Sequence, residues 1–286
     1  MSAATIKLFL PYGDPKRLRT AEISNWNGKA IAAPRTELDQ LLARDELTQP
    51  GVYLLTGTEP ATGKAAAYIG EAEVIRDRIK QQRDKEFWVQ ALIFVSKDEN
   101  LTKAHVRYLE GRLISDASAA GRAQLVNTQT SGAKLPESDR EDMEVFLTKV
   151  HQLLPVLGSD VLTPILEAKP PSGELETPLI CEIKGLVAKG RRTPNGFVVF
   201  EGSQAVLENR PSAAGQHPVV VSLREKLVAD GILVKDKNHY RFMKNAEFSS
   251  PSAAAAVIHG GGANGLTAWK TQTGKTLKDL EARVAV

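Results

Sequence analysis

The chain has 286 residues, more than one typical domain, so its length favours two folding units that can each fill a hydrophobic core. A formal net charge of +3 permits a polyanionic partner but falls short of the bias that would require one. Cys181 is the only cysteine, which excludes an intramolecular disulfide and a thiolate-rich zinc site within one chain.

The expected compartment is a reducing cytoplasm. No apolar run is long enough to span a bilayer, and residues 1–5 lack the charged start and hydrophobic segment of a secretory signal. We therefore expect a soluble cytoplasmic protein without a membrane partner.

Residues 1–49 are predicted to form a lead-in to the main domain. The segment 5–11, TIKLFLP, is typical of a strand. The segment 36–46, TELDQLLARDE, is typical of a short helix bounded by Pro34 and Pro50.

Residues 50–130 are predicted to form a small domain with a mainly antiparallel three-stranded sheet flanked by helices, an α/β domain of the α+β type. Two apolar runs, 52–56 and 65–69, enclose GTEPATGK, whose turn residues predict a hairpin. A helix is expected over 73–82, and the short apolar run 92–96 predicts a buried third strand.

A second helix of this domain is bounded by local signals. Thr102 can cap its start, and the helix is expected to end near Gly121, before the short apolar segment 124–127. The order of elements is then strand, strand, helix, strand, helix.

Residues 131–180 are predicted to hold a connecting helix and a linker. Ser138 and Glu141 have the spacing of a capping box, and apolar residues recur at helical spacing until Pro155. The segment 168–178, AKPPSGELETP, has the composition of an inter-domain linker.

Residues 181–286 are predicted to form a second small α/β domain. A strand with a turn at Glu201-Gly202 precedes a helix that Gly231 terminates. Further on, Ser250 before Pro251 suits the start of a short alanine-rich helix.

An ordered set of polar residues spans the 50–130 domain. The tripeptides Gly51-Val52-Tyr53 and Tyr68-Ile69-Gly70 occupy the two hairpin strands, and the set continues with Arg78, Glu110 and Asn127. Taken singly, these residues also fit ordinary places as hairpin aromatics, solvated helix residues and a turn asparagine.

Glu110 draws attention because its helical neighbours Val106, Leu113 and Ile114 are apolar. A carboxylate buried on such a face requires a cation, a metal or a hydrogen-bond donor. The alternative is a place at the solvated edge of the stripe, near Arg107.

Together these residues resemble the GIY-YIG nuclease family, over about residues 50–130. The second tripeptide matches the family name without change, and the first carries Val52 as a conservative replacement. Arg78 follows Tyr68 by ten residues, where the family places its arginine. The resemblance implies an endonuclease that hydrolyses DNA phosphodiester bonds; the sequence distinguishes neither strandedness nor DNA from RNA.

The resemblance also implies the role of each residue. Tyr53 would assist the attacking water as general base, Tyr68 would orient water or phosphate, and Asn127 would support the site. Arg78 would grip the scissile phosphate through its fork of donors. Glu110 would hold Mg²⁺ or Mn²⁺, since hard oxygen ligands suit these ions.

One position departs from the family pattern. Many members carry a histidine four residues after the arginine, whereas this chain has Gln82. Gly70 and Lys85 are predicted to contact substrate. The departure at Gln82 supports an alternative, a catalytically impaired scaffold that binds nucleic acid or regulates another protein.

The second domain resembles an uncharacterised domain found C-terminal to GIY-YIG modules. Lys189, Arg191 and Arg192 lie before a glycine turn and are predicted to clamp a phosphate backbone, with Lys270 adding a contact. The alternative is a solvated basic turn.

Overall fold

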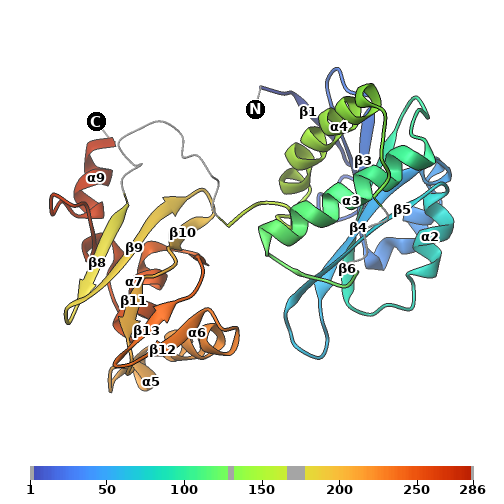
Figure 1. The fold of residues 1–286 in the computed structure, drawn as a ribbon. Coiled ribbons are helices and arrows are strands. Elements are labelled where there is room, and N and C mark those ends of the chain that lie inside the picture. The colour runs from blue at the N-terminus through green and yellow to red at the C-terminus, as the bar shows by residue number, and fades with distance from the viewer. Residues whose placement is uncertain (1–2, 128–131, 166–177, 285–286) are drawn as a thin grey trace. The chain divides into compact units, whose positions relative to one another are not determined.

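The computed structural model describes residues 3–127, 132–165 and 178–284 (Figure 1). The chain divides into two compact units, Met1–Pro164 and Ile165–Val286. Both units are mixed α/β, with largely antiparallel sheets, as the sequence predicts. Of the predicted linker 168–178, residues 168–177 lie outside the described residues.

A seven-stranded sheet forms the centre of the first unit, in the order β1-β2-β3-β6-β4-β5-β7. All neighbouring strands are antiparallel except β5 and β7, which run parallel. The strands are β1 Ile6–Phe9, β2 Arg19–Ile23, β3 Gly28–Pro34, β4 Gly51–Thr58, β5 Ala65–Ala72, β6 Trp88–Ser96 and β7 Gln124–Leu125.

Helices cover both faces of this sheet. One face packs against α3 Lys103–Ala120 and α4 Glu137–Val156, which lie across the sheet in Figure 1. The other face packs against α1 Leu38–Leu42, α2 Ile75–Gln81 and the 3-10 turn Asp45–Thr48, and a second 3-10 turn, Arg35–Glu37, precedes α1.

The alternation of side chains along the central hairpin assigns each residue to one face. Val52 and Leu54 of β4 point into the core beneath α3 and α4. Tyr53 and Leu55 point into the opposite core, beneath α1 and α2. Both cores are closed to water at these positions, since all four side chains are fully buried.

Several local predictions are confirmed. The Thr102 side chain accepts a hydrogen bond from the amide of His105 at the start of α3, and Gly121 ends that helix in the left-handed conformation with φ 63°. The hairpin and the third strand form as expected, and β6, β4 and β5 are the predicted antiparallel trio within the wider sheet.

Other local predictions are wrong. The capping box at Ser138 and Glu141 does not form, because α4 begins at Glu137 after Pro136, which puts Ser138 inside the helix. The helix predicted at 36–46 is shorter, since only Leu38–Leu42 are α-helical. Residues 1–49 also supply β1, β2 and β3 to the same sheet as the hairpin.

The second unit contains two sheets. A five-stranded sheet has the order β14-β10-β9-β8-β15, and a three-stranded sheet has the order β11-β13-β12. The strands are β8 Leu179–Ile183, β9 Leu186–Thr193, β10 Gly196–Val199, β11 Gln204–Val206, β12 Leu233–Asp236, β13 His239–Phe242, β14 Ala246–Phe248 and β15 Trp269–Lys270.

The described part of the second unit also contains five helices. They are α5 Ala213–Gln216, α6 Pro218–Ala229, α7 Pro251–His259, α8 Gly265–Ala268 and α9 Leu277–Val284. The side chain of Ser250 caps α7 as predicted, and α7 shares a core with Phe197 and Trp269. Gly231 follows α6 with φ 65°, also as predicted. Among the described residues, no helix has both the length and the apolarity to cross a membrane.

Candidate active site

Tyr53 and Tyr68 lie side by side on one face of the β4–β5 hairpin. Tyr53 pairs directly with Gly70 and Tyr68 with Leu55, so the two tyrosines are diagonal neighbours. Their rings stack, with centroids 5.9 Å apart and planes inclined by 25°. Tyr53 is fully buried and Tyr68 is 9% exposed. The hairpin therefore brings the two predicted phenols together.

Steric crowding explains why glycine occupies residues 51 and 70 of the two tripeptides. A β-carbon at Gly70 would lie 2.5 Å from both Cζ and Oη of Tyr53, and one at Gly51 would lie 2.4 Å from the carbonyl oxygen of Phe94. No side chain fits at either distance, so glycine at residue 70 makes the space that the Tyr53 phenol fills. This accounts for Gly70 by packing; the predicted substrate contact stays a prediction.

Two cations approach the tyrosine pair. The positive charge of Arg78, on α2, acts on the phenols of Tyr53 and Tyr68, while its Nη1 donates to Gln81 at 2.8 Å. The Lys85 ammonium lies 4.0 Å from the centroid of the Tyr68 ring, a cation–π contact. The structure thus brings four predicted residues, Tyr53, Tyr68, Arg78 and Lys85, into one cluster, called here the phenol cluster.

The protonation of Tyr53 bears directly on its predicted role. Burial raises the pKa of its phenol strongly, the neighbouring Tyr68 raises the pKa further, and the positive charge of Arg78 acts in the opposite direction. In the protein without ligands Tyr53 is therefore a neutral phenol at physiological pH. It could accept a proton only after more positive charge arrives.

Gln82 completes the phenol cluster from the C-terminal end of α2. It is 3% exposed, and its Nε2 lies 3.4 Å from the hydroxyl of Tyr53. Its Oε1 is buried without a hydrogen-bond partner among the described residues. Trp88 donates from Nε1 to the Gln82 carbonyl at 3.0 Å, which fixes the backbone of this residue. The residue at which the chain departs from the GIY-YIG pattern therefore contacts Tyr53 through its amide.

Glu110 reaches the hairpin from another direction. It lies half-buried on α3, whose apolar side packs on the face of the sheet opposite the tyrosines. Lys103 and Arg107, two turns and one turn earlier on the same side of α3, contact Glu71 of β5 at 3.0 and 3.9 Å. This side of α3 therefore lies beside strand β5. Since Glu110 and the phenol cluster are on opposite faces of the sheet, a ligand that contacts both would have to pass along β5.

Asn127 is attached to β5 between the tyrosine and the glycine of the second tripeptide. Its Oδ1 accepts from the Ile69 amide at 3.1 Å, and its Nδ2 donates to the Ile69 carbonyl at 2.6 Å. These bonds continue the parallel pairing of β5 with β7 by one step. Asn127 thus supports the strand that carries Tyr68, as a supporting residue would.

Glu110 is the carboxylate expected to hold a divalent ion. Within the described ranges, no group of three or more His, Cys, Asp or Glu side chains is arranged to bind a metal. A single carboxylate such as Glu110 suits Mg²⁺, which keeps several waters and uses substrate phosphate oxygens as further ligands. A dedicated protein cage for Ca²⁺ or Zn²⁺ is not formed by these residues.

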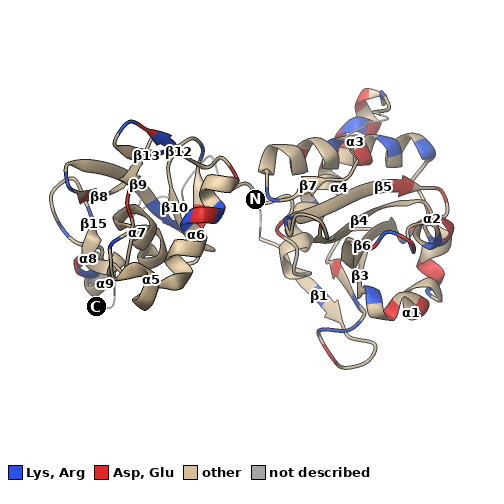
Figure 2. Cartoon of the chain, turned by 90° about the horizontal axis from the view of Figure 1, so that it is seen from below, with Lys and Arg blue, Asp and Glu red and all other residues tan. Residues whose placement is uncertain are grey.

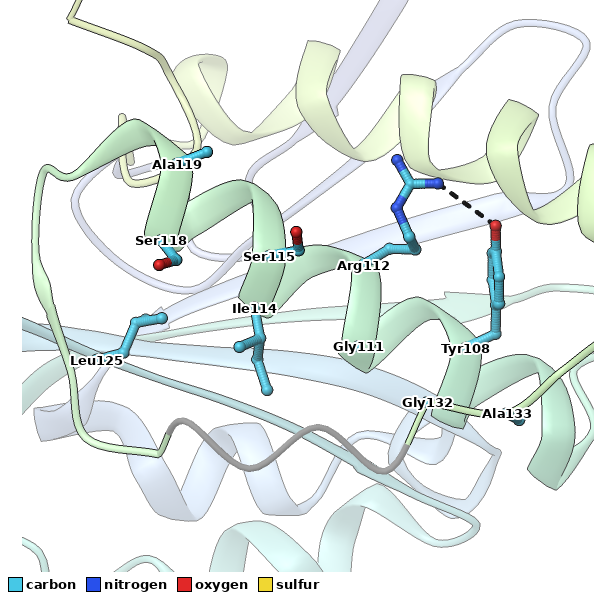
Figure 3. A pocket seen from close by; sticks show the side chains of 10 residues that line it. All are labelled: Tyr108, Gly111, Arg112, Ile114, Ser115, Ser118, Ala119, Leu125, Gly132 and Ala133. Atoms are coloured by element: carbon cyan, nitrogen blue, oxygen red, sulfur yellow. Dashed lines mark hydrogen bonds between the residues drawn. The ribbon is translucent and has the colours of Figure 1, made fainter.

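A cavity of about 660 Å³ lies along another side of α3 (Figure 3). It is lined by Tyr108, Gly111, Arg112, Ile114, Ser115, Ser118, Ala119, Leu125, Gly132 and Ala133. Tyr108 and Arg112 both bind Glu144 of α4, so their polar groups already have partners. The cavity holds none of the predicted catalytic side chains.

The predicted basic clamp of the second unit is divided by its strand. Lys189, Arg191 and Arg192 all lie on β9, but Arg192 points to the opposite face from the other two. Arg192 shares the core face with its partner Phe197 and pairs with Glu281 at 2.7 Å. The three residues therefore do not form one clamp.

Sequence reasoning missed the direct contact between Gln82 and Tyr53. The available signal was the place of Gln82 one turn after Arg78 and beside the apolar Ile79, which puts an amide near the buried side of α2. It also missed Glu71 as the carboxylate that receives Lys103 and Arg107, for which an isolated glutamate in a strand is no clear signal.

Comparison with known proteins identifies a domain in the second unit. Residues 179–281 match the family described as a domain of unknown function (DUF4357). No GIY-YIG family match is found for the first unit. No curated protein and no solved structure matches the chain. The second unit is therefore similar to this family over residues 179–281, and no comparison bears on the first unit.

Proposed function

We propose that the first unit is a metal-dependent endonuclease that hydrolyses DNA phosphodiester bonds. The observation that supports this most is the phenol cluster, in which two stacked phenols meet a guanidinium and an ammonium group. A structural hairpin has no need of two cations against one tyrosine pair. A phosphodiester in hydrolysis needs such donors, because negative charge grows on its oxygens.

Arg78 and Lys85 would bind the scissile phosphate. The Arg78 fork can donate two parallel hydrogen bonds to phosphate oxygens, and Lys85 adds a point charge on the side of Tyr68. Because the charge of Arg78 acts on both phenols, a phosphate held by Arg78 would lie near their hydroxyl groups. The reacting group would then lie next to Tyr53.

Tyr53 would take the proton of the attacking water. Burial keeps its phenol neutral in the free protein, so this role depends on positive charge that arrives with the substrate complex. Gln82, which donates from Nε2, would stabilise the phenolate oxygen once it forms. Mg²⁺ or Mn²⁺, with Glu110 as its carboxylate ligand, would supply Lewis-acid stabilisation of phosphate charge and an activated water.

A second candidate is a nucleic-acid-binding or regulatory scaffold that does not cleave. The specific observation in its favour is Gln82, since an amide cannot accept and release a proton as a histidine can. The neutral, buried state of Tyr53 favours this candidate as well.

Cleavage assays with the full chain separate the two candidates. The substrates are supercoiled plasmid, which reports nicking and double-strand cleavage, single-stranded DNA and RNA, each with Mg²⁺, Mn²⁺ or EDTA. We expect metal-dependent cleavage that Glu110→Ala and Tyr53→Phe abolish. Binding without cleavage under every metal would establish the scaffold instead.

Matched controls exclude contamination and misfolding. Glu141→Ala removes an exposed carboxylate of α4, and Tyr12→Phe removes the hydroxyl of a half-exposed tyrosine far along the chain from the cluster. Both controls should cleave like the parent. Cleavage that survives Glu110→Ala and Tyr53→Phe would show that another site or a contaminant is responsible.

A further inference from the structure

The pairing of strands in the second unit defines an outer sheet face. In β8 and β9, alternate residues such as Cys181 and Ala188 point into the core beneath α7, and their neighbours point outward. Lys189 is an outward residue and lies directly opposite Ile180. Directly paired residues share a face, so Ile180 and Lys189 lie together on the outer side.

Lys270 joins this face from a distant part of the sequence. Strand β15 pairs with β8 so that Lys270 lies opposite Ile180 on its other side. The row Lys270, Ile180, Lys189 thus crosses three adjacent strands, and a strand spacing of about 4.8 Å puts the two lysine backbones roughly 10 Å apart. Both lysine side chains are exposed, and neither forms an ion pair with a described carboxylate.

Arg191 extends the row along β9. It is two residues from Lys189 and opposite Val198, and therefore on the same outer side. Lys189, Arg191 and Lys270 are called here the lysine face. A hollow of about 380 Å³ adjoins it beside Ile180 and Lys270, lined also by the carboxylate of Glu182 and by the hydroxyl and amide side chains of Thr267, Thr271 and Gln272.

The charge of the chain is unevenly divided. Residues 179–281 contain 14 lysines and arginines against 9 aspartates and glutamates, a net charge of +5. All remaining residues contain 23 against 25, a net charge of −2. Figure 2 shows both signs interspersed on α3 of the first unit. Attraction for a polyanion therefore resides in the second unit.

We propose that the lysine face binds the phosphate backbone of nucleic acid without reading its sequence. Exposed lysines on a net positive unit supply counterion-releasing contacts to phosphates. Base stacking is not part of this mode, because the described strands put no aromatic side chain on the outer face. Glu182 and Glu247 lie on the same face, opposite Val187 and Val198, and bound the contact area.

The choice of nucleic acid over another polyanion rests on the proposed function of the first unit. Residues 1–164 contain 21 lysines and arginines against 22 aspartates and glutamates, so the first unit supplies no long-range attraction, and a tethered cationic unit would raise the local substrate concentration. Binding by the lysine face does not itself require cleavage. The inference can therefore be tested separately from the chemistry at Glu110.

Binding is measured by fluorescence anisotropy with the full chain carrying Glu110→Ala, in EDTA. The probes are a labelled 30-base-pair DNA duplex, a single strand of the same length and its RNA equivalent, each titrated between 50 and 300 mM salt. Lys189→Ala with Lys270→Ala should weaken duplex binding tenfold or more. It should also make the slope of log affinity against log salt shallower by about 1.8, the value for two lost phosphate contacts.

Lys235→Ala with Lys244→Ala is the matched control, because it removes two exposed lysines of the same unit from outside the lysine face. Circular dichroism and melting temperature establish that each variant folds. The control should keep affinity and slope within twofold of the parent. Equal losses in the two double variants would overturn the proposal, since net charge alone would then explain binding.

Competition identifies the chemical class of the partner. Unlabelled DNA should displace the probe at far lower concentration than polyglutamate of equal charge. Polyglutamate that competes as well as DNA would overturn the nucleic-acid assignment in favour of an acidic protein. Absence of cleavage by the parent chain changes neither result, because every binding measurement uses the Glu110→Ala background.

Discussion

Gly70 lies directly opposite Tyr53 in the β4–β5 hairpin, and the phenol of Tyr53 fills the space that a side chain at Gly70 would need. The first prediction follows from this pair. Gly70→Ala should destabilise the first unit by about 1–3 kcal/mol, as overpacking of a full core does. Cleavage should fall by about a hundredfold, because the Tyr53 phenol must move.

Urea unfolding and plasmid cleavage measure these effects. Gly132→Ala is the control, since a β-carbon there meets no atom within 4 Å and the backbone is not in the left-handed region. If Gly70→Ala and Gly132→Ala behaved alike, the close approach of Gly70 and Tyr53 would not exist in solution.

The buried phenol of Tyr53 predicts a dependence of stability on pH. Its pKa is raised in the folded state, so the fold favours the neutral form. The resulting stabilisation is complete below the unfolded pKa of about 10 and is lost as pH rises above that value. Between pH 9 and 11 the parent should therefore lose more free energy of unfolding than Tyr53→Phe, which lacks the titrating group.

Tryptophan fluorescence can isolate the first unit in this measurement. Trp26 and Trp88 belong to the first unit, and Trp269→Phe removes the tryptophan of the second. Unfolding in urea is then followed at each pH for both proteins. Parallel loss of stability in the parent and in Tyr53→Phe would contradict the raised pKa.

Local signals explain which parts of the fold the sequence predicts. Thr102 and Gly121 bound α3 because caps act on the residues next to them. Strand β3, GKAIAAP, was not predicted, since its alanines carry little strand propensity and its pairing with β6 is a tertiary contact. At α4, Pro136 supplies the helix start that Ser138 was expected to supply.

The candidate site residues were also easier to predict where they are close together in the sequence. Tyr53, Tyr68 and Arg78 are close in sequence, and their clustering follows from a hairpin and one helix. Arg191 and Arg192 were predicted to act together, yet adjacent residues of a strand point to opposite faces. Lys270 was expected to add a contact beside Lys189, and the two residues do lie in one row, because β15 and β9 both pair with β8.

Asn127 carries the third prediction. Asn127→Ala removes two hydrogen bonds to the Ile69 backbone and should cost about 1–3 kcal/mol, since each leaves a polar group without its partner. Asn127→Asp should be no better, because a carboxylate cannot donate to the Ile69 carbonyl.

Hydrogen exchange at the Ile69 amide tests this directly. Its protection should fall in both variants while amides in the centre of β4 keep theirs. Gln124→Ala, at an exposed side chain of β7, is the control and should leave Ile69 protected. Unchanged protection in Asn127→Ala would show that the strand does not depend on this side chain.

The last prediction separates the catalytic and structural contributions of Gln82. Its Oε1 is buried without a described partner, which is costly, and its Nε2 contacts Tyr53. Gln82→Met keeps the volume but removes both atoms. Stability should therefore stay equal or rise, while kcat falls tenfold or more and KM changes little, because the lost donor acts on the phenolate.

Gln82→His tests the same contact through pH. An imidazole titrates near pH 6.5 in water and at lower pH when buried, so the pH profile of the cleavage rate should show an added titration at or below that pH, absent from the parent. Gln152→Met, at a half-buried glutamine of α4, is the control and should retain the parent's kcat and pH profile. If Gln82→Met kept the full kcat of the parent, Gln82 would have no part in the reaction, and Tyr53 would act with Arg78 alone.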